Sequence, residues 1–287
     1  MMKNNEKLSV IVPVFNEEKV VKETLEKLRQ ELQNLHVGFE IIAVNDGSSD
    51  ASLEILKNIP NITLINNPYN LGYGASLKRA LRAASGEWVL ITDSDGTYPI
   101  DKIPDILEYA GDYDMVVGSR IHQKDAPGRK PAKWILKKLA SFLVGKKIPD
   151  LNSGMRVFRR DKALEFYDLY PSGFSFTTTI TLSFFTHDYT VKYVDIPYYE
   201  RVGISSIRPK HFFDFLGLVM KLVLYFKPLK MLFTPVAIIF LLGAAKAAKD
   251  IVITGKIGNL SLILILFSFQ SFIMTLILEI VTRKNIK

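Results

Sequence analysis

Short apolar runs alternate with amphipathic stretches along the first two thirds of the chain. Each run ends in a polar turn, which is typical of a buried strand that leads into a helix. In the first amphipathic stretch, apolar residues at helical spacing share one face, at Val21, Leu25, Leu28 and Leu32. Strands are predicted at residues 8–14, 39–45, 62–65, 87–91, 115–118 and 190–197, and a further helix at about 75–84.

This alternation predicts an α/β fold in which a mixed, mainly parallel sheet carries helices on both faces. Ligands of such sheets bind beyond the carboxyl ends of the strands. Polar residues follow four of the predicted strands at this position: Asn16 with Glu17, Asp46, residues 70–72 and residues 93–95. Four polar turns on one rim predict a single site for a phosphorylated ligand, although loops on such a rim are polar in any case.

The fourth apolar run ends abruptly in Asp93 and Asp95, and residues 96–99 then break the strand. Side chains two positions apart on an extended chain face the same way, so both carboxylates are expected to share one cation. Their hard oxygen atoms suit Mg²⁺ or Mn²⁺ bridged to substrate phosphates. An Asp-rich turn with no ligand is the alternative, and a lone Asp-x-Asp would favour it.

The other polar turns have physical roles of the same kind. Asp46 carries only acceptors, which suit the donors on a nucleobase edge, or it caps the next helix. Gly72 and Gly74 permit a close backbone approach before a helix whose N-terminus favours anions, or they serve the turn alone. On that helix Lys78 or Arg79 could reach a phosphate, with a solvated helix face as the alternative.

Composition adds a membrane to this picture. The chain has 287 residues, 48% of them hydrophobic, and the apolar excess falls after about residue 212. The mean hydropathy of +0.15 is high for a soluble protein. The net charge is +8, and many basic residues lie beside apolar helical stretches, which favours a membrane surface over nucleic acid. The absence of cysteine excludes disulfides and zinc–thiolate sites. The N-terminus shows no signal-peptide pattern.

Residues 231–248 and 260–282 are long and apolar enough for two membrane spans, although Gln270 and Glu279 are costly in the second. Residues 210–227 are too short for a span and are predicted to form an interface helix. Two spans return the C-terminus to the side of the N-terminal domain, and the positive-inside rule makes that side cytoplasmic. Lys227, Lys230, Arg283, Lys284 and Lys287 support this orientation, and Lys246, Lys249 and Lys256 oppose it weakly. The lengths disfavour a buried hairpin of a soluble protein.

Residues 131–147 are predicted to form a second interface helix. Ile135, Leu139 and Phe142 make an apolar stripe that lysines flank, and Trp134 lies near its start. A basic amphipathic helix with a tryptophan fits the membrane interface. A helix packed on the sheet with solvated lysines is the alternative.

Four motifs now support a resemblance. Residues 12–18, 45–50, 70–75 and 93–99 resemble family 2 glycosyltransferases with the GT-A fold, and more narrowly dolichyl-phosphate mannose synthases and polyprenyl-phosphate glucosyltransferases. The motifs recur in the family's order, and the resemblance covers about residues 8–209. It implies a catalytic domain at 1–209, an interface helix at 210–227 and two transmembrane helices at 228–287.

The resemblance also implies site residues. It places a divalent metal, Mn²⁺ or Mg²⁺, on Asp93 and Asp95, with Thr97 where mannose synthases use Gln or Ser. The nucleotide is expected on Pro13, Phe15, Asn16, Glu17, Asp46, Asn70, Gly72 and Ser94.

Two further segments carry candidate phosphate ligands. Residues 150–156 resemble the family's Asp-x-x-Ser-Gly-Phe-Arg motif with Met155 in place of Phe, a swap of similar volume. Arg120 and Arg156 suit bidentate binding of phosphate, with structural salt bridges as the alternative. The expected catalytic residues are Asp93, Asp95, Arg120, Arg156 and Arg201.

Residues 200–209 resemble the family's Arg-x-Gly-x-Ser-Lys segment. Arg201 and Ser205 match, but Ser206 replaces the lysine. Arg208 lies two residues further on, a shift of roughly 6–7 Å along a strand. The expected ligands of an acceptor phosphate are Ser153, Arg156, Arg201, Ser205 and Arg208.

The resemblance implies inverting transfer of a hexose, glucose or mannose, from UDP-glucose or GDP-mannose to a polyprenyl or dolichyl phosphate. A phosphate monoester is already ionised at neutral pH, so this nucleophile needs no general base. The partners are therefore the nucleotide sugar, the lipid phosphate and membrane lipid, with no nucleic acid; a homo-oligomer stays open.

Other functions stay open at this point. A non-catalytic nucleotide-sugar-binding subunit is supported only by Ser206, and transfer to another lipid or glycan acceptor is a further alternative. A processive polysaccharide synthase would need Gln-x-x-Arg-Trp after the metal motif, but Trp134 is the last tryptophan and no such motif contains it. A nucleotidyltransferase would need a glycine-rich loop, which residues 13–18 lack.

Overall fold

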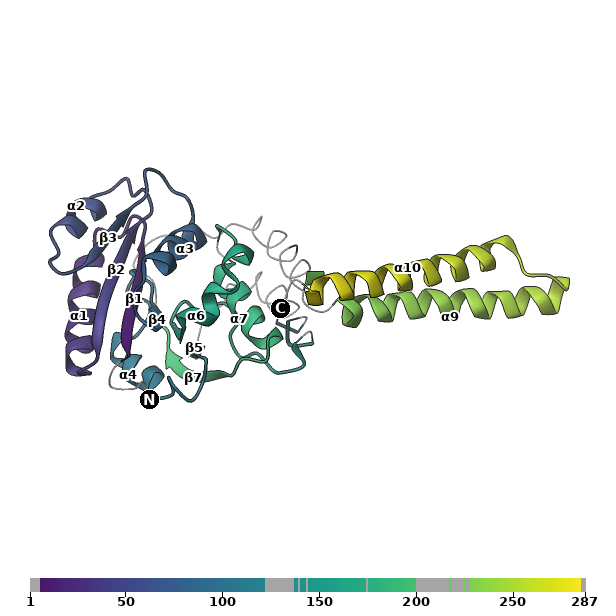
Figure 1. Ribbon diagram of the computed structural model, residues 1–287. Coiled ribbons are helices and arrows are strands. Elements are labelled where there is room, and N and C mark those ends of the chain that lie inside the picture. The colour runs from purple at the N-terminus through teal and green to yellow at the C-terminus, as the bar shows by residue number, and fades with distance from the viewer. Residues whose placement is uncertain are drawn as a thin grey trace. The chain divides into compact units, whose positions relative to one another are not determined.

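The computed structural model describes residues 6–121, 137–138, 140–142, 144–173, 175–199, 217, 224–225 and 228–284 (Figure 1). The chain divides into two compact units, Met1–Phe215 and Leu216–Lys287, which are described separately. The predicted interface helix at 210–227 lies largely outside the described residues. The one at 131–147 is described at 137–138, 140–142 and 144–147, and of these residues 137–138, 140–142 and 144 are helical.

The first unit is built on one sheet, which has seven strands in the described part of the chain. Their order is β3-β2-β1-β4-β6-β5-β7, and only β6 runs antiparallel to its neighbours. The mixed, mainly parallel sheet is therefore confirmed. The strands are β1 Lys7–Val14, β2 Gly38–Asn45, β3 Thr63–Asn66, β4 Trp88–Ile91, β5 Met115–Ile121, β6 Arg156–Arg159 and β7 Val191–Pro197.

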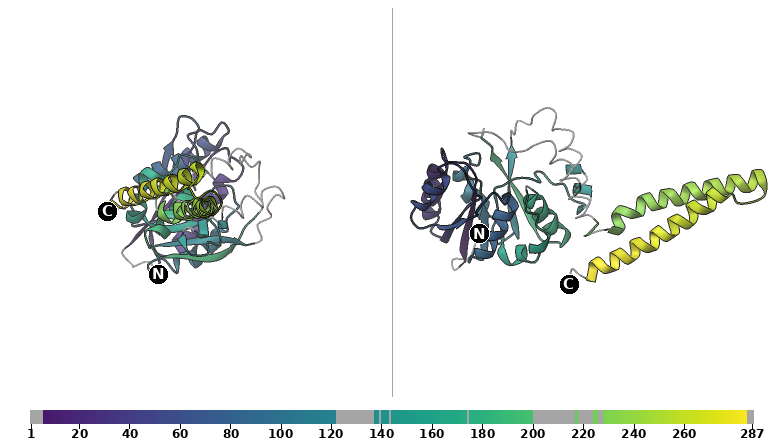
Figure 2. Two further views of the ribbon diagram at one scale, coloured as in Figure 1. Left: turned by 90° about the vertical axis from the view of Figure 1, so that its right-hand side faces the viewer. Right: turned by 90° about the horizontal axis from the view of Figure 1, so that it is seen from above.

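Helices cover both faces of this sheet, as predicted (Figures 1 and 2). Alternate strand residues face opposite sides, so Val10 packs in the core under α1 while Ile11 packs in the core under α3. The predicted stripe of α1 is fully buried. The helices are α1 Val21–Asn34, α2 Ser52–Lys57, α3 Tyr73–Ala83, α4 Ile103–Leu107, α6 Arg160–Leu164 and α7 Phe176–Thr186, with short 3-10 turns η1 Ile100–Lys102 and η3 Tyr167–Leu169.

Strand direction places the ends of seven strands at one edge. The parallel strands bring their carboxyl ends there, and antiparallel β6 brings its first residue, Arg156, which pairs with Ile91 of β4 and Val117 of β5. We call this edge the rim. Strand β6 was not predicted, because its two apolar residues, flanked by Arg156 and Arg159, are too short an apolar run to indicate a strand.

The second unit consists of α9 Pro228–Thr254 and α10 Asn259–Lys284, which run side by side (Figure 2). Helix α9 extends beyond the predicted span 231–248, so the connection shrinks to 255–258. Charged residues remain in its last turns because they are paired: Lys246 Nζ lies 2.9 Å from Asp250 Oδ1, and Asp250 Oδ2 accepts from the Ser261 hydroxyl (2.5 Å) and the Gly258 N–H (3.2 Å).

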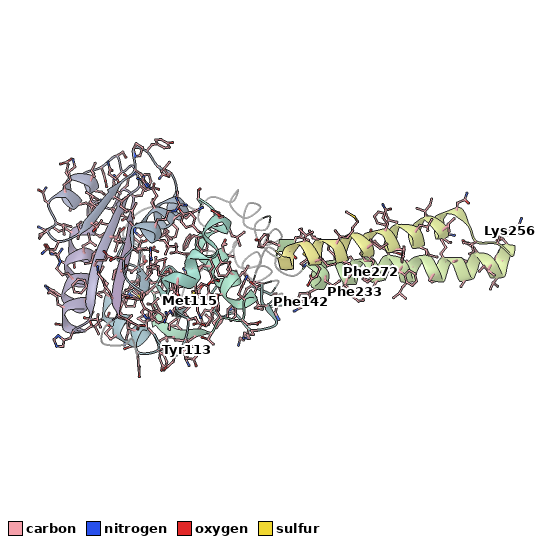
Figure 3. The ribbon with its side chains drawn as sticks, viewed as in Figure 1. Tyr113, Met115, Phe142, Phe233, Lys256 and Phe272 are labelled. Atoms are coloured by element: carbon pink, nitrogen blue, oxygen red, sulfur yellow. The ribbon has the colours of Figure 1, made fainter. Side chains whose placement is uncertain are left out.

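Small residues fill the interface between α9 and α10, and large apolar side chains point outward. A Cβ on Gly243 would lie 2.9 Å from Leu264 Cβ, so the helices approach closely there. Phe233 and Phe272 contact edge to face at 6.3 Å (Figure 3). The buried residues of α10 are polar and seven positions apart, at Ser261, Ser268, Thr275 and Thr282. By length and composition both helices are candidate membrane spans.

The open end of this hairpin also has a polar contact. Glu279, predicted to be costly in the second span, accepts a hydrogen bond from the Leu229 N–H at 3.2 Å. Leu229 is the second residue of α9, where backbone N–H groups have no partner within the helix. Glu279 therefore caps α9 from the neighbouring helix.

Candidate active site

Hydrogen bonds join the loops that follow β1 and β2. The Asn16 N–H donates to Ser48 Oγ (3.1 Å), and Asn16 Oδ1 accepts from the Ser49 N–H (2.8 Å). The Glu17 N–H donates to Ser52 Oγ at 2.9 Å. Asn16 has a φ of +56°, a left-handed conformation that asparagine tolerates better than most residues. The predicted nucleotide residues Asn16 and Glu17 therefore shape the rim together with the second loop.

Asp46 is buried and organises the third loop of the rim. Its Oδ1 accepts from the Leu71 N–H (3.0 Å) and from Asn67 Nδ2 (2.7 Å), and its Oδ2 accepts from the Gly72 N–H (3.0 Å). A carboxylate offers about four acceptor sites, so these contacts leave capacity for a nucleobase donor. Asn67 was missed by the sequence analysis; its only signal is its place just after the third strand.

The start of α3 differs from the prediction. The N–H groups of Gly74 and Ala75 donate to the carbonyls of Gly173 (3.1 Å) and Ser172 (2.9 Å). A Cβ on Gly74 would lie 2.1 Å from the Pro171 carbonyl oxygen. The expectation that these N–H groups face a phosphate is therefore wrong, because the turn at 171–173 already uses them.

Two of the three basic residues of α3, Lys78 and Arg79, also have protein partners. Lys78 Nζ donates to the Tyr170 carbonyl at 3.1 Å, and Arg79 donates to Asn67 Oδ1. Lys78 is half-buried, whereas Arg79 is exposed, as the alternative of a solvated helix face expects. Both side chains hold α3 to its neighbours in this structure.

The metal motif lies in a turn and not on a strand. Strand β4 ends at Ile91, before Asp93 and Asp95. The expectation that an extended chain turns both carboxylates to the same side is therefore wrong. Asp95 Oδ1 accepts from the Thr97 N–H (3.1 Å) and from Thr97 Oγ1 (2.6 Å). Asp95 and Thr97 are thus close enough in space to bind one metal ion together.

The motif is tied to its surroundings on two sides. Ser94 Oγ donates to the Pro13 carbonyl at 2.8 Å, which joins the turn to β1. Asp93 Oδ1 accepts from the Tyr73 hydroxyl at 3.0 Å. Burial, together with the nearby Asp93 charge, raises the pKa of Tyr73 well above its usual value, so the hydroxyl remains a donor at neutral pH.

The donor set of this turn fits a hard divalent cation. Within the described ranges, no group of three or more His, Asp or Glu side chains is arranged around a metal position. Asp93, Asp95 and the Thr97 hydroxyl supply oxygen atoms, which Mg²⁺ and Mn²⁺ prefer. Mg²⁺ typically binds through one or two carboxylates and takes its other ligands from phosphates and water. A phosphorylated ligand on the rim would complete such a site.

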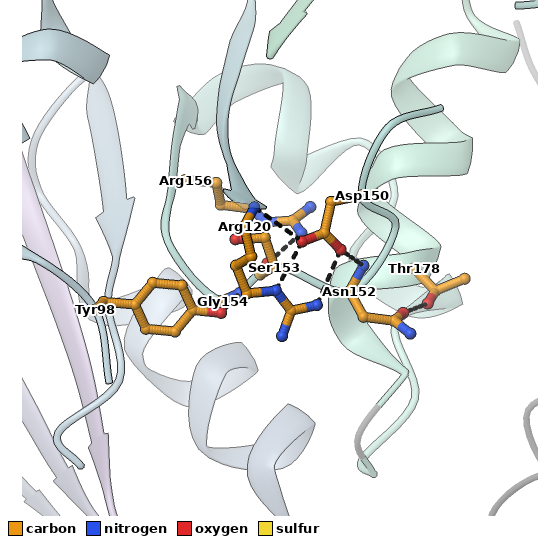
Figure 4. A network of polar contacts seen from close by, with 8 residues as sticks. All are labelled: Tyr98, Arg120, Asp150, Asn152, Ser153, Gly154, Arg156 and Thr178. Carbon is orange, nitrogen blue, oxygen red and sulfur yellow. Dashed lines mark hydrogen bonds and ion pairs between the residues drawn. The ribbon is translucent and has the colours of Figure 1, made fainter. Parts of the chain in front are cut away.

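Arg120 forms an ion pair and does not present a free guanidinium. Its Nε and Nη2 donate to Asp150 Oδ2 (2.7 Å) and Oδ1 (2.9 Å), and its backbone N–H also donates to Asp150 Oδ2 at 3.3 Å (Figure 4). Burial raises the pKa of Asp150, but the hydrogen bonds and charge of Arg120 outweigh it, so this pKa lies below its usual value. The salt-bridge alternative therefore describes Arg120.

Arg156 is fully buried and faces protein acceptors (Figure 4). Its Nε donates to the Ser153 carbonyl at 3.1 Å. Its Nη1 donates to the Thr177 carbonyl (3.0 Å) and to Thr181 Oγ1 (2.8 Å). Burial lowers the pKa of Arg156 from its usual value. Its donors fasten the 153–156 turn to α7, and a contact between Arg156 and a substrate phosphate stays a prediction.

The remaining predicted acceptor residues divide into two groups. Ser153 is fully buried, and the contact between its hydroxyl and a phosphate stays a prediction. Arg201, Ser205 and Arg208 lie outside the described residues. The described chain reaches Tyr199, whose N–H donates to the Thr97 carbonyl at 3.0 Å, so the segment before Arg201 is anchored on the metal turn.

Phe15, Asn70 and Pro13 complete the predicted set. Phe15 is 39% exposed at the end of β1, where a large side chain is free to contact a ligand. Asn70 is also exposed, and Pro13 is buried within β1. The rim thus brings together the loops of Asn16, Asp46, Asn70 and Asp93.

Comparison with known proteins agrees with this arrangement. Residues 9–166 match the profile of Glycosyl transferase family 2. The chain is 30% identical over 208 residues to the low-salt glycan biosynthesis hexosyltransferase of Haloferax volcanii, a match that covers 70% of this chain but 49% of that protein. It is 30% identical over 206 residues to the dolichyl-phosphate hexose transferase of the same organism, covering 70% of this chain and 87% of that protein.

A solved structure has the same fold. Glucosyl-3-phosphoglycerate synthase from Mycobacterium tuberculosis, in complex with Mn²⁺, UDP and phosphoglyceric acid, matches with a TM-score of 0.61 over 76% of this chain and 79% of that chain. The sequence identity of 16% means that this likeness shows the fold alone, a GT-A fold. Together, the profile match and the relatives show that this chain is a glycosyltransferase and belongs to glycosyl transferase family 2.

Proposed function

We propose that this chain transfers a hexose from a nucleoside-diphosphate sugar to a polyprenyl or dolichyl phosphate at a membrane surface. The observation that carries the proposal is the meeting of Asp46, Asp93 and Asp95 on one rim of a chain that also ends in an apolar hairpin. The name of the dolichyl-phosphate hexose transferase, of which the chain covers 87%, supports the same acceptor class.

The donor binds in this proposal across the loops of β1 to β4. Asp46 accepts from the nucleobase, and the exposed ring of Phe15 packs against it. Asp93 and Asp95, with Thr97, hold Mn²⁺ or Mg²⁺ on the diphosphate. A bound divalent cation would neutralise charge on the leaving nucleoside diphosphate.

The acceptor supplies its own nucleophile. A phosphate monoester oxygen attacks the anomeric carbon, the new carbon–oxygen bond forms as the bond to the diphosphate breaks, and the configuration inverts. No proton has to leave the attacking oxygen, so this chain needs no general base. Because Arg120 and Arg156 are engaged within the protein, we assign the acceptor phosphate to Arg201, Ser205 and Arg208.

The hairpin carries the membrane part of the proposal. In a water-soluble hairpin, large apolar side chains fill the interface and polar ones face outward. Here Ser268 and Thr275 are buried while Ile263 and Phe269 are 60% and 63% exposed. Close packing through small residues with an apolar exterior is the pattern of membrane helices. We propose two spans, with the catalytic unit on the cytoplasmic side that the positive-inside rule favours.

Transfer of labelled sugar tests the proposal. Detergent-solubilised full chain receives Mn²⁺ or Mg²⁺, a short polyprenyl phosphate and, in separate reactions, UDP-glucose or GDP-mannose. We expect label in the lipid with one donor and a loss on the order of 100-fold or more in Asp95→Ala, which removes a metal ligand. Asp101→Ala is the matched control, because Asp101 is exposed near the same turn. No labelled lipid with either donor, or full activity in Asp95→Ala, would refute the proposal.

A further inference from the structure

We infer that Tyr73 and Gly154 are positioning residues that fix the orientation of the Asp93 carboxylate and thereby set the affinity of the site for its divalent cation. This inference rests on the proposed metal-dependent transfer. It concerns two residues that were not among the predicted site residues, one at the start of α3 and one in the turn before β6.

Tyr73 holds one oxygen of Asp93. Its hydroxyl donates to Asp93 Oδ1 at 3.0 Å. The backbone on both sides of Tyr73 is fixed, since the Gly72 N–H donates to Asp46 and the Gly74 N–H donates to the Gly173 carbonyl. Because the backbone of Tyr73 is fixed, its hydroxyl restricts rotation of the Asp93 carboxylate about the Cβ–Cγ bond. A hydroxyl on a mobile loop would move together with the carboxylate and would not restrict it.

Gly154 confines the other oxygen. A Cβ at this position would lie 2.6 Å from Asp93 Oδ2 and 3.0 Å from its Cγ, so a larger residue would displace the carboxylate from this position. The glycine itself is held in place, because its N–H donates to the Tyr98 hydroxyl at 2.6 Å (Figure 4). Arg156 fastens the preceding residue through the Ser153 carbonyl.

Asp93 and Asp95 are therefore oriented by different kinds of contact. Asp95 is oriented locally by Thr97, two residues away. Asp93 is oriented by residues 20 positions before it and 61 positions after it (93 − 73 and 154 − 93). Partners that orient a metal ligand affect affinity through geometry, and their loss typically costs 10–100-fold in affinity or activity.

Binding of Mn²⁺ to the full chain in detergent tests this inference. Free Mn²⁺ is counted by its electron paramagnetic resonance signal in the presence of UDP and, separately, of GDP. We expect Tyr73→Phe to weaken Mn²⁺ binding on the order of 10-fold. Gly154→Ala displaces the carboxylate and is expected to weaken it at least as much. Saturating Mn²⁺ restores sugar transfer in Tyr73→Phe, since the ligands themselves remain.

Tyr170→Phe is the matched control. The Tyr170 hydroxyl is buried in the first unit and donates to the Ala163 carbonyl at 2.6 Å, so this variant also loses one buried hydroxyl donor. We expect it to lower stability without changing Mn²⁺ affinity. Mn²⁺ affinity of Tyr73→Phe within twofold of wild type would overturn the inference and leave the proposed transfer intact. Absence of Mn²⁺ binding in the wild type would overturn both the inference and the proposed metal.

Discussion

The two sides of the rim hold their charged residues with different partners. On the donor side, residues 15–17, 46–50, 67–72 and 93–97, carboxylates accept from backbone N–H groups and hydroxyls. On the arginine side, Arg120 and residues 150–156, both guanidiniums are engaged by protein acceptors. The end of a strand brings a residue to the rim, but the neighbouring loops decide whether its charge remains available to a ligand.

The largest effect is expected from removing the buried cation of the arginine side. Arg156→Met leaves the carbonyls of Ser153 and Thr177 without their donor and should cost about 4 kcal/mol, since each unsatisfied buried acceptor costs about 1–3 kcal/mol. Thermal unfolding of the detergent-solubilised chain measures this. Arg159→Met is the control on the same strand, because Arg159 is 35% exposed and its ion pairs are weak.

Arg156→Met also distinguishes the two roles considered for this residue. A variant that keeps the stability of wild type and loses only acceptor binding would make Arg156 a phosphate ligand. In that case Arg156 would present its charge to a ligand, as we propose for the carboxylates of the donor side.

On the donor side, Asp46→Asn is expected to weaken nucleotide binding by about 10–100-fold. The new NH₂ group replaces an acceptor for the nucleobase by a donor, and a polar group left unpaired in this way costs about 1–3 kcal/mol. Calorimetric titration with UDP and with GDP measures the loss. Asn66→Ala is the control, because Asn66 lies at the end of β3 but accepts from Asn45. Unchanged nucleotide affinity would show that Asp46 only supports the loop.

The ion pair of the arginine side predicts a pH dependence. Because the folded-state pKa of Asp150 is lowered, the pair stabilises the fold above the ordinary aspartate pKa of about 4. This contribution is lost as the pH falls through the lowered folded-state value. Asp150→Asn should cost about 2 kcal/mol at pH 7. The variant should also lose less stability than wild type between pH 5 and pH 3, as followed by thermal unfolding. Parallel curves for the two proteins would contradict this assignment.

The smallest effect is expected where this chain departs from the family's motif. Met155 is fully buried in the core under α1, and a swap of similar volume usually costs less than about 1.5 kcal/mol. Met155→Phe should therefore keep sugar transfer within about twofold of wild type. A large loss of sugar transfer would show that the core behind the turn has no room to repack. Labelled transfer measures activity, and a parallel unfolding curve measures stability, so a loss of activity is distinguished from a loss of folded protein.

Much of the donor side was predictable from sequence because the rules are local. Asp46 and Asp93 each follow an apolar run, and parallel strands place such residues on one rim. The helix face of α1 was predicted correctly for the same reason. The helical hairpin was recognised from length and apolar composition, although the pairing of Lys246 with Asp250 extends α9 further than hydropathy suggests.

What the sequence did not show depends on contacts between distant segments. Arg156 looks like an exposed phosphate ligand until β6 places it under α7. The start of α3 looks like an anion site until the turn at 171–173 covers its N–H groups. Tyr73 and Gly154 belong to no pattern of spacing, because their importance arises from where Asp93 lies between them.

The placement of Gly154 against Asp93 has a consequence for biosynthesis. The Asp93 carboxylate lies between Tyr73 and Gly154, which are far apart in the sequence. Strand β6 can pair with β4 only after the chain that connects them has been synthesised. Contacts of such long sequence separation form late, because the entropy of closing the loop must be overcome first. A ribosome-bound chain that has emerged only as far as Asp95 therefore carries the proposed metal ligands without the partners that orient Asp93. We expect the nascent protein to bind the proposed cation only after Gly154 and β6 have been synthesised.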